Sequence, residues 1–221
     1  MSAETLLAPP EAHIPMDGAG FAAATGATAA QMADLEAYRA LLAEWNQRMN
    51  LVGPSALANF WDRHAFDSAQ LLDLAPEGSK TWADLGAGAG LPGLILAILL
   101  KDTPGACVHL IESMAKRCTF LRTVVAALNL PAEVHNERAE SLDMTVDIVT
   151  ARACAPMNRL LMFAAPYLRR GAVGLFLKGQ DVETELADSP KARSYKVRLE
   201  PSRSNPAGRI VKIEGGPRAR R

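Results

Sequence analysis

The feature that most constrains the fold is a glycine-rich turn between a short apolar run and an apolar helix. Residues 81–85 (Thr-Trp-Ala-Asp-Leu) are typical of a buried strand, the turn occupies 86–90 (Gly-Ala-Gly-Ala-Gly), and Pro92 opens the helical run at 91–101. Proline suits the start of a helix because the N–H it lacks has no partner there. Glycines reach positive φ and let a ligand approach the backbone. The segment predicts a strand–turn–helix unit, either as a ligand-binding site or as a tight turn alone.

Short β-type runs and longer helical patterns alternate after this point. We predict strands at residues 81–85, 106–111, 132–135, 146–151, 172–177, 195–199 and 209–213, and helices at 91–101, 113–128, 156–168 and 181–187. Such alternation requires crossover connections and a mostly parallel sheet covered on both faces, with ligands at the carboxyl ends of the strands. Only a loop separates the last two strands, which predicts an antiparallel hairpin. We therefore expect a Rossmann-like α/β fold with seven strands and an antiparallel last strand.

The N-terminal third has a different pattern. Residues 1–30 are rich in Ala, Gly, Pro and Thr without periodicity, which predicts a poorly ordered leader. Apolar residues at helical spacing predict helices at 31–50 and 56–74. Since 221 residues suit one core, we expect residues 31–78 to form a helical extension packed on a domain at 79–216.

Charge is balanced overall but unevenly distributed. The first 38 residues contain five acids and neither Lys nor Arg, whereas residues 217–221 form a basic tail, and the net charge is zero. A basic tail can contact phosphates or can be solvated. Overall charge thus gives no support for a nucleic-acid partner.

Export, membrane insertion and metal binding have no support in the sequence. The N-terminus lacks a basic region before an apolar run, and the longest clean apolar run, 94–100, is too short to cross a bilayer. The three cysteines, Cys107, Cys118 and Cys154, form no CxxC pair, so neither a disulfide framework nor a zinc site is indicated. We expect a cytoplasmic chain with reduced thiols and no metal.

The glycines alone do not choose a cofactor. Gly88, Gly90 and Gly93 also fit the dinucleotide pattern G-x-G-x-x-G. Asp84 favours S-adenosylmethionine (SAM), because a carboxylate just before the turn can reach the cationic methionine end and would repel a pyrophosphate. Glu112 follows the second strand, where an acid can bond ribose hydroxyls of either cofactor. The polar loop 136–140 after the third strand is placed to meet an adenine ring, although such loops are often only solvated.

The segment after the fourth strand bears on the methyl acceptor. Residues 150–156 (Thr-Ala-Arg-Ala-Cys-Ala-Pro) lack the Asn/Asp-Pro-Pro-aromatic motif of adenine amino-group methyltransferases. Cytosine-C5 enzymes need a cysteine nucleophile, and the spacing of Cys154 to Pro156 does not fit theirs. A ring nitrogen such as guanine N7 attacks directly and needs only alignment and electrostatics.

Blocks spread over residues 38 to 214 resemble one known family. They are 45–51 (Trp-Asn-Gln-Arg-Met-Asn-Leu), 63–68 (Arg-His-Ala-Phe-Asp-Ser), 84–93 (Asp-Leu-Gly-Ala-Gly-Ala-Gly-Leu-Pro-Gly), 112–113 (Glu-Ser), 116–117 (Lys-Arg), 120–122 (Phe-Leu-Arg), 138–140 (Arg-Ala-Glu), 151–153 (Ala-Arg-Ala) and 177–180 (Leu-Lys-Gly-Gln). Together they resemble the bacterial 16S ribosomal RNA guanine-N7 methyltransferases, also called glucose-inhibited division protein B. The Gly-Leu-Pro-Gly and Arg-His-x-x-Asp-Ser blocks are not general features of SAM enzymes.

The resemblance implies a class I SAM-dependent methyltransferase fold and an enzyme that forms 7-methylguanine at guanine 527, in the 530 loop of 16S ribosomal RNA. SAM would be the cofactor and S-adenosylhomocysteine the product, with 16S RNA or a small-subunit particle as substrate and no obligate protein partner. By resemblance Gly86 and Leu91 contact SAM, Ala139 and Glu140 lie beside its adenosine, and Arg152 stands at the active-site end of the fourth strand. The physical argument adds the other cofactor residues, Asp84, Gly88, Gly90 and Glu112.

Cationic residues are the candidates for RNA binding. Arg and Lys neutralise phosphates, and a guanidinium can stack on a splayed base. The set placed around the opening of the site is Arg63, His64, Lys116, Arg117, Arg152 and Lys178. Arg152 is expected to position the reactants rather than to act as a general base. A small-molecule methyltransferase, a NAD-dependent oxidoreductase and a non-catalytic RNA-binding module remain as alternatives.

Overall fold

The seven predicted strands are all present and lie in one sheet. The computed structural model describes residues 16–53 and 57–215. Its strands are β1 (Thr81–Leu85), β2 (Cys107–Ile111), β3 (Ala132–His135), β4 (Ile148–Arg152), β5 (Val173–Lys178), β6 (Lys196–Pro201) and β7 (Arg209–Glu214). They are ordered β3-β2-β1-β4-β5-β7-β6, and β7 is antiparallel to both of its neighbours. The predicted mostly parallel sheet with an antiparallel last strand is confirmed.

The strand order places a crevice at the centre of the sheet. From β1 the chain moves outward to β2 and β3 and then returns to pair β4 with β1 on its other side. Ligands of such sheets bind outside the carboxyl ends of the strands at this reversal. Asp84, near the end of β1, lies between Leu110 of β2 and Thr150 of β4.

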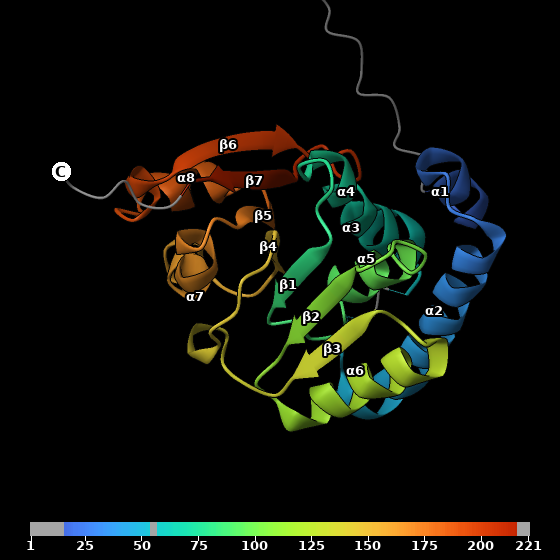
Figure 1. Cartoon of the computed structure of the whole chain (residues 1–221). Coiled ribbons are helices and arrows are strands. Elements are labelled where there is room, and N and C mark those ends of the chain that lie inside the picture. Colours follow the sequence, from blue (N-terminus) through green and yellow to red (C-terminus); the bar gives the residue numbers. More distant parts are fainter. Residues whose placement is uncertain (1–15, 54–56, 216–221) are drawn as a thin grey trace, which may run out of the picture.

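Helices cover both faces of the sheet (Figure 1). On one side lie α2 (Ala29–Met49), α5 (Gly93–Leu99) and α6 (Ala115–Leu128), and on the other α7 (Met157–Arg169) and α8 (Val182–Ala187). Successive strand residues point to opposite faces, so Val108 and Leu110 join the first core and Ile111 joins the second. No helix among the described residues is long and apolar enough to cross a membrane.

The first residues that the structure describes correct the predicted leader. Helix α1 (Gly18–Thr25) begins at Asp17, whose side chain accepts a hydrogen bond from the Gly20 N–H at 2.8 Å. Phe21 is fully buried, and its ring centroid lies 5.4 Å from that of Trp61. Alanine is the strongest helix former, and Phe21 packs this alanine-rich helix on the core although the segment lacks apolar periodicity. Residues 1–15 and the predicted basic tail at 217–221 lie outside the described residues.

The single helix predicted at 56–74 is replaced by shorter segments. A π-helical segment, η1 (Phe60–Phe66), leads into α3 (Asp67–Ala69) and α4 (Leu71–Leu74). Six of the seven η1 residues are buried, so the segment contacts its surroundings on nearly all sides rather than along one stripe. Segments of this kind are frequent at functional sites, and η1 carries Arg63 and His64 to the carboxyl end of the sheet.

Candidate active site

The glycine turn has the backbone that its composition predicted. Gly86, Gly88 and Gly90 have φ of +69°, +57° and +86°, a region that strains L-residues with a side chain. The N–H groups of Gly86 and Ala87 donate to the carbonyl of Ile111 at 2.8 and 3.0 Å, which fixes the turn to the end of β2. A β-carbon on Gly86 would lie 2.8 Å from Cys154 Sγ. The turn therefore stays narrow where it faces the crevice.

Two glycines of the dinucleotide pattern, Gly90 and Gly93, pack closely against neighbouring side chains. A β-carbon on Gly90 would lie 2.2 Å from Leu94 Cδ1, and one on Gly93 would lie 2.3 Å from Leu110 Cδ2. The Gly93 N–H donates to Asp84 Oδ2 at 3.0 Å. These two glycines serve the close packing of Leu94 on the turn and of α5 on the sheet.

Asp84 is a fully buried acid with a strongly raised pKa. Its Oδ1 has no hydrogen-bond partner among the described residues. Burial raises its pKa from 3.8 to about 7, although the bond from Gly93 and the charge of Arg152 act in the opposite direction. A buried acceptor without a partner is costly, and a positive charge beside the turn would stabilise the Asp84 carboxylate.

Glu112 joins the turn to the second strand. Its Oε2 accepts from the Gly88 N–H at 3.1 Å and its Oε1 from the Met114 N–H at 2.8 Å. Arg117 Nη1 lies 3.7 Å from Oε2. The side chain is almost fully buried, and its bound oxygens keep lone pairs that can accept ligand hydroxyls.

A cavity of about 370 Å³, which we call the glycine-turn cavity, opens between these groups. Gly86, Glu112, Ala139 and Glu140, all predicted to bind the cofactor, line it. The other predicted cofactor residues do not line it: Asp84, Gly88, Gly90, Leu91 and Arg152. Among these, Gly88 bonds the lining residue Glu112, Asp84 bonds Gly93 at the start of α5, and Gly90 and Leu91 are buried.

Sequence reasoning missed an apolar side of this cavity. Met114, which is 51% exposed, lines it together with Phe163, Arg159 and Cys154. The Arg159 guanidinium stands 5.3 Å from the centre of the Phe163 ring. Met114 lies two residues after Glu112, and this position beside a predicted cofactor residue was the only sequence feature that could have indicated it. The exposure that sets it apart from core methionines arises only in the folded chain.

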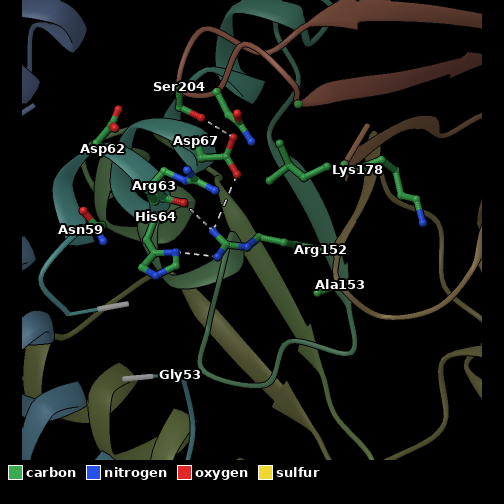
Figure 2. A pocket seen from close by; sticks show the side chains of 14 residues that line it. Gly53, Asn59, Asp62, Arg63, His64, Asp67, Arg152, Ala153, Lys178 and Ser204 are labelled. Carbon is green, nitrogen blue, oxygen red and sulfur yellow. Dashed lines mark hydrogen bonds and ion pairs between the residues drawn. The ribbon is translucent and has the colours of Figure 1, made fainter. Parts of the chain in front are cut away.

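A second cavity of about 560 Å³, which we call the Arg152 cavity, lies on the other side of the β4 end (Figure 2). Arg152 Nη1 donates to the Arg63 carbonyl at 2.9 Å, Nη2 bonds His64 Nδ1 at 2.5 Å, and Asp67 Oδ2 lies 3.7 Å away. Ala153, with φ of +49°, lines both cavities. Ala153, the residue that follows β4, therefore borders both cavities.

His64 is held neutral in this arrangement. Burial and the charge of Arg152 lower its pKa to about 4. Because Nδ1 accepts from Arg152, the ring proton resides on Nε2. That nitrogen is buried and has no hydrogen-bond partner among the described residues.

The loop between β6 and β7 forms one wall of the Arg152 cavity, although the sequence predicted only a hairpin connection. Ser204 Oγ donates to Asp67 Oδ1 at 2.6 Å, and Gln70 Nε2 donates to the same oxygen at 3.0 Å. Asp67 thereby joins the loop to Arg152. Ser204 and Asp67 are 137 positions apart in the sequence, and no local pattern indicates their contact.

The six basic residues predicted around one opening are divided in the structure. Arg63, His64 and Arg152 line the Arg152 cavity. Lys178 borders it, but its ammonium bonds Glu185 at 2.6 Å and the Ala155 carbonyl at 3.2 Å, and points away (Figure 2). The remaining two lie elsewhere: Arg117 lines the glycine-turn cavity, and Lys116 is exposed on α6, outside both linings.

Comparison with known proteins yields consistent matches. A family model described as GidB, rRNA small subunit methyltransferase G, matches residues 31–203. Ribosomal RNA small subunit methyltransferase G of Caulobacter vibrioides (strain NA1000 / CB15N) is 63% identical over 199 residues, which cover 90% of this chain and 92% of that protein. The protein of the same name from Bradyrhizobium sp. (strain BTAi1) is 48% identical over 184 residues, 81% of this chain and 82% of that one.

Solved structures share the fold at low identity. A SAM-dependent methyltransferase from Aquifex aeolicus aligns with a TM-score of 0.51 and 18% identity over 74% of this chain and 93% of its own. A putative rRNA-methylase from Clostridium thermocellum aligns with a TM-score of 0.50 and 14% identity over 66% of this chain and 92% of its own. The architecture is that of class I SAM-dependent methyltransferases, as predicted.

Proposed function

Because this chain belongs to the rRNA small subunit methyltransferase G family, SAM-dependent enzymes that act on 16S ribosomal RNA, we propose that it methylates N7 of one guanine in that RNA. The observation that carries the proposal is the pair of cavities that share Ala153 as a lining residue. One is lined by an acidic strand end and a glycine turn, and the other by Arg63, His64 and Arg152. A nucleoside cofactor and a nucleic-acid base thus have adjoining places.

The glycine-turn cavity fits SAM, whose bound form supplies a methyl group on a cationic sulfonium. Glu112 offers acceptors to ribose hydroxyls, and Met114 offers apolar surface to a base. Asp84 lies buried behind the turn and does not line the cavity, and its carboxylate charge would attract the cationic end of SAM. Gly86 leaves room beside Cys154 that a side chain would fill. These side chains bind and orient the cofactor.

The Arg152 cavity fits a guanine that needs no general base. The N7 lone pair is free at neutral pH, so alignment and fixed electrostatics supply most of the rate. Guanine presents N7 and O6 as acceptors on one edge. Arg152 lines this cavity, and its guanidinium, held by Arg63, His64 and Asp67, has further N–H groups that can donate to O6. N7 then remains free to attack.

We further propose that the N-terminal helices and the sheet act as one domain, because His64 and Arg152 must share the cavity. The chain is neutral overall, so RNA contact depends on the local cations rather than on net charge. The proposed location is the cytoplasm, and the proposed substrate is free 16S RNA or a small-subunit particle.

Nucleoside mapping tests the proposal. In a deletion strain, 7-methylguanine at the implied position of 16S RNA should disappear, and the wild-type chain should restore it. The purified chain with SAM should produce S-adenosylhomocysteine and 7-methylguanine on unmodified free RNA or on small-subunit particles, and the comparison identifies the substrate form. An unchanged level of 7-methylguanine in deletion-strain 16S RNA would contradict the proposal.

A further inference from the structure

A cluster of two histidines and one glutamate lies at the β3 edge of the sheet. His109 belongs to β2, and Glu133 and His135 belong to the neighbouring edge strand β3 (Figure 1). In the parallel register His109 pairs with Glu133, and Ile111 pairs with His135. Residues on paired strands with this alternation share one face. The cluster is therefore on the face opposite α5 and α6, which Val108 and Leu110 contact.

The ligand atoms of the three side chains converge. His109 Nδ1 lies 3.0 Å from His135 Nε2 and 3.5 Å from Glu133 Oε2, and His135 Nε2 lies 3.8 Å from the same oxygen. The two imidazole side chains are 17% and 22% exposed, whereas Glu133 is 64% exposed. Nitrogen and carboxylate donors thus form a triangle that is open to solvent on one side.

The dimensions of the triangle match a tetrahedral metal site. Zinc binds imidazole nitrogen and carboxylate oxygen at about 2.0–2.2 Å, and ligands at the corners of a tetrahedron of that size are separated by about 3.4 Å. The three measured separations, 3.0, 3.5 and 3.8 Å, lie around this value. A donor set of two imidazoles and one carboxylate leaves the fourth corner for water, and imidazole favours zinc over magnesium or calcium.

We propose that His109, Glu133 and His135 bind one zinc ion that fastens the edge strand β3 to β2. Cysteine spacing predicted no zinc site, and the histidine site was not visible because its members meet only through strand pairing. The site is distinct from both cavities, whose linings do not include the three residues. It is nevertheless adjacent to one: the Glu112 N–H donates to the His135 carbonyl at 3.0 Å, and β3 leads into the loop that reaches Ala139.

Zinc titration of the purified full chain tests the proposal. After chelator treatment and dialysis against micromolar zinc, metal analysis should give one zinc per chain. Free zinc at 100 times the Kd should raise Tm by roughly 5–10 °C. Replacing zinc with cobalt should give the intense visible absorption of a tetrahedral site, a readout that needs no variant. Zinc bound only at millimolar concentration, or a weak octahedral cobalt spectrum, would overturn the proposal in favour of a hydrogen-bonded histidine pair.

Single substitutions locate the ligands. His109→Ala, His135→Ala and Glu133→Gln should each weaken zinc binding at least about 100-fold, more than the loss typical of an outer-shell change. Glu200→Gln, also on a strand, and His13→Ala, outside the described residues, are matched controls that should keep full affinity. Retained SAM binding shows that each variant is folded. Full zinc affinity in the three cluster variants would place the metal elsewhere and refute the assignment.

Discussion

Replacing Asp84 with asparagine should change how stability depends on pH. Asp84 is buried, and its pKa is raised from 3.8 to about 7 because burial disfavours the charged form. The folded chain therefore holds a proton that the unfolded chain has lost between these two values. In that window the unfolded state binds fewer protons, so this group's contribution to stability falls as pH rises. It is fully present below pH 3.8 and is lost by about pH 7.

The size of the effect follows from the width of the window. Between pH 5 and the folded pKa of about 7 lie about two units, and each unit corresponds to about 1.36 kcal/mol. Asp84→Asn removes the titration and keeps an acceptor for the Gly93 N–H. Relative to the wild type, the variant should gain about 3 kcal/mol between pH 5 and pH 8. Any constant cost of the new amide cancels in this difference.

Urea denaturation of the SAM-free chain measures the difference. With an m-value of about 2–3 kcal/mol/M for a chain of this size, the midpoint of the variant should move up by about 1 M relative to the wild type. Asp102→Asn, at an exposed position, is the matched control and should follow the wild-type profile. The same Asp84→Asn change should weaken SAM binding at least about tenfold by removing a charged partner. Parallel wild-type and variant profiles from pH 5 to pH 8 would refute the reasoning.

Three further predictions address the two cavities. Arg152→Lys should lower the rate of methyl transfer by about 10²-fold with SAM affinity unchanged, because Arg152 lines the Arg152 cavity and not the glycine-turn cavity. A parallel loss of SAM affinity, measured by calorimetry, would contradict separate roles for the two cavities. Gly86→Ala should lower the free energy of unfolding by about 1–2 kcal/mol because φ is positive, and it should weaken SAM binding because the new β-carbon meets Cys154 Sγ. Adding Cys154→Ala should restore SAM binding but not stability, as measured by titration and thermal melting. Met114→Ala should raise the Kd for SAM about 3–10-fold and leave Tm unchanged, since this side chain is exposed without the cofactor; a fall in Tm would show that it belongs to the core.

Local patterns were sufficient for the central part of the fold. The strand, glycine turn and helix around Asp84 form as predicted, and the alternation that follows correctly indicated the mostly parallel sheet and the antiparallel hairpin, although not the order of the strands. These features depend on nearest neighbours: glycines are required where φ is positive, and apolar runs must be buried on a sheet. The same reasoning failed at Phe21 and over η1, where contacts with distant residues outweigh periodicity.

By itself, the sequence determined the family, the glycine turn and the identity of the residues that end β1, β2 and β4. Only the tertiary structure decided which of them face a cavity. It separated Lys116 and Lys178 from Arg152, gave His64 a single neutral form, and placed His109 against His135. The reason is physical: a turn or a strand is selected by the preferences of adjacent residues, whereas a cavity, a shifted pKa or a set of metal ligands depends on groups that become neighbours only when distant segments pack together.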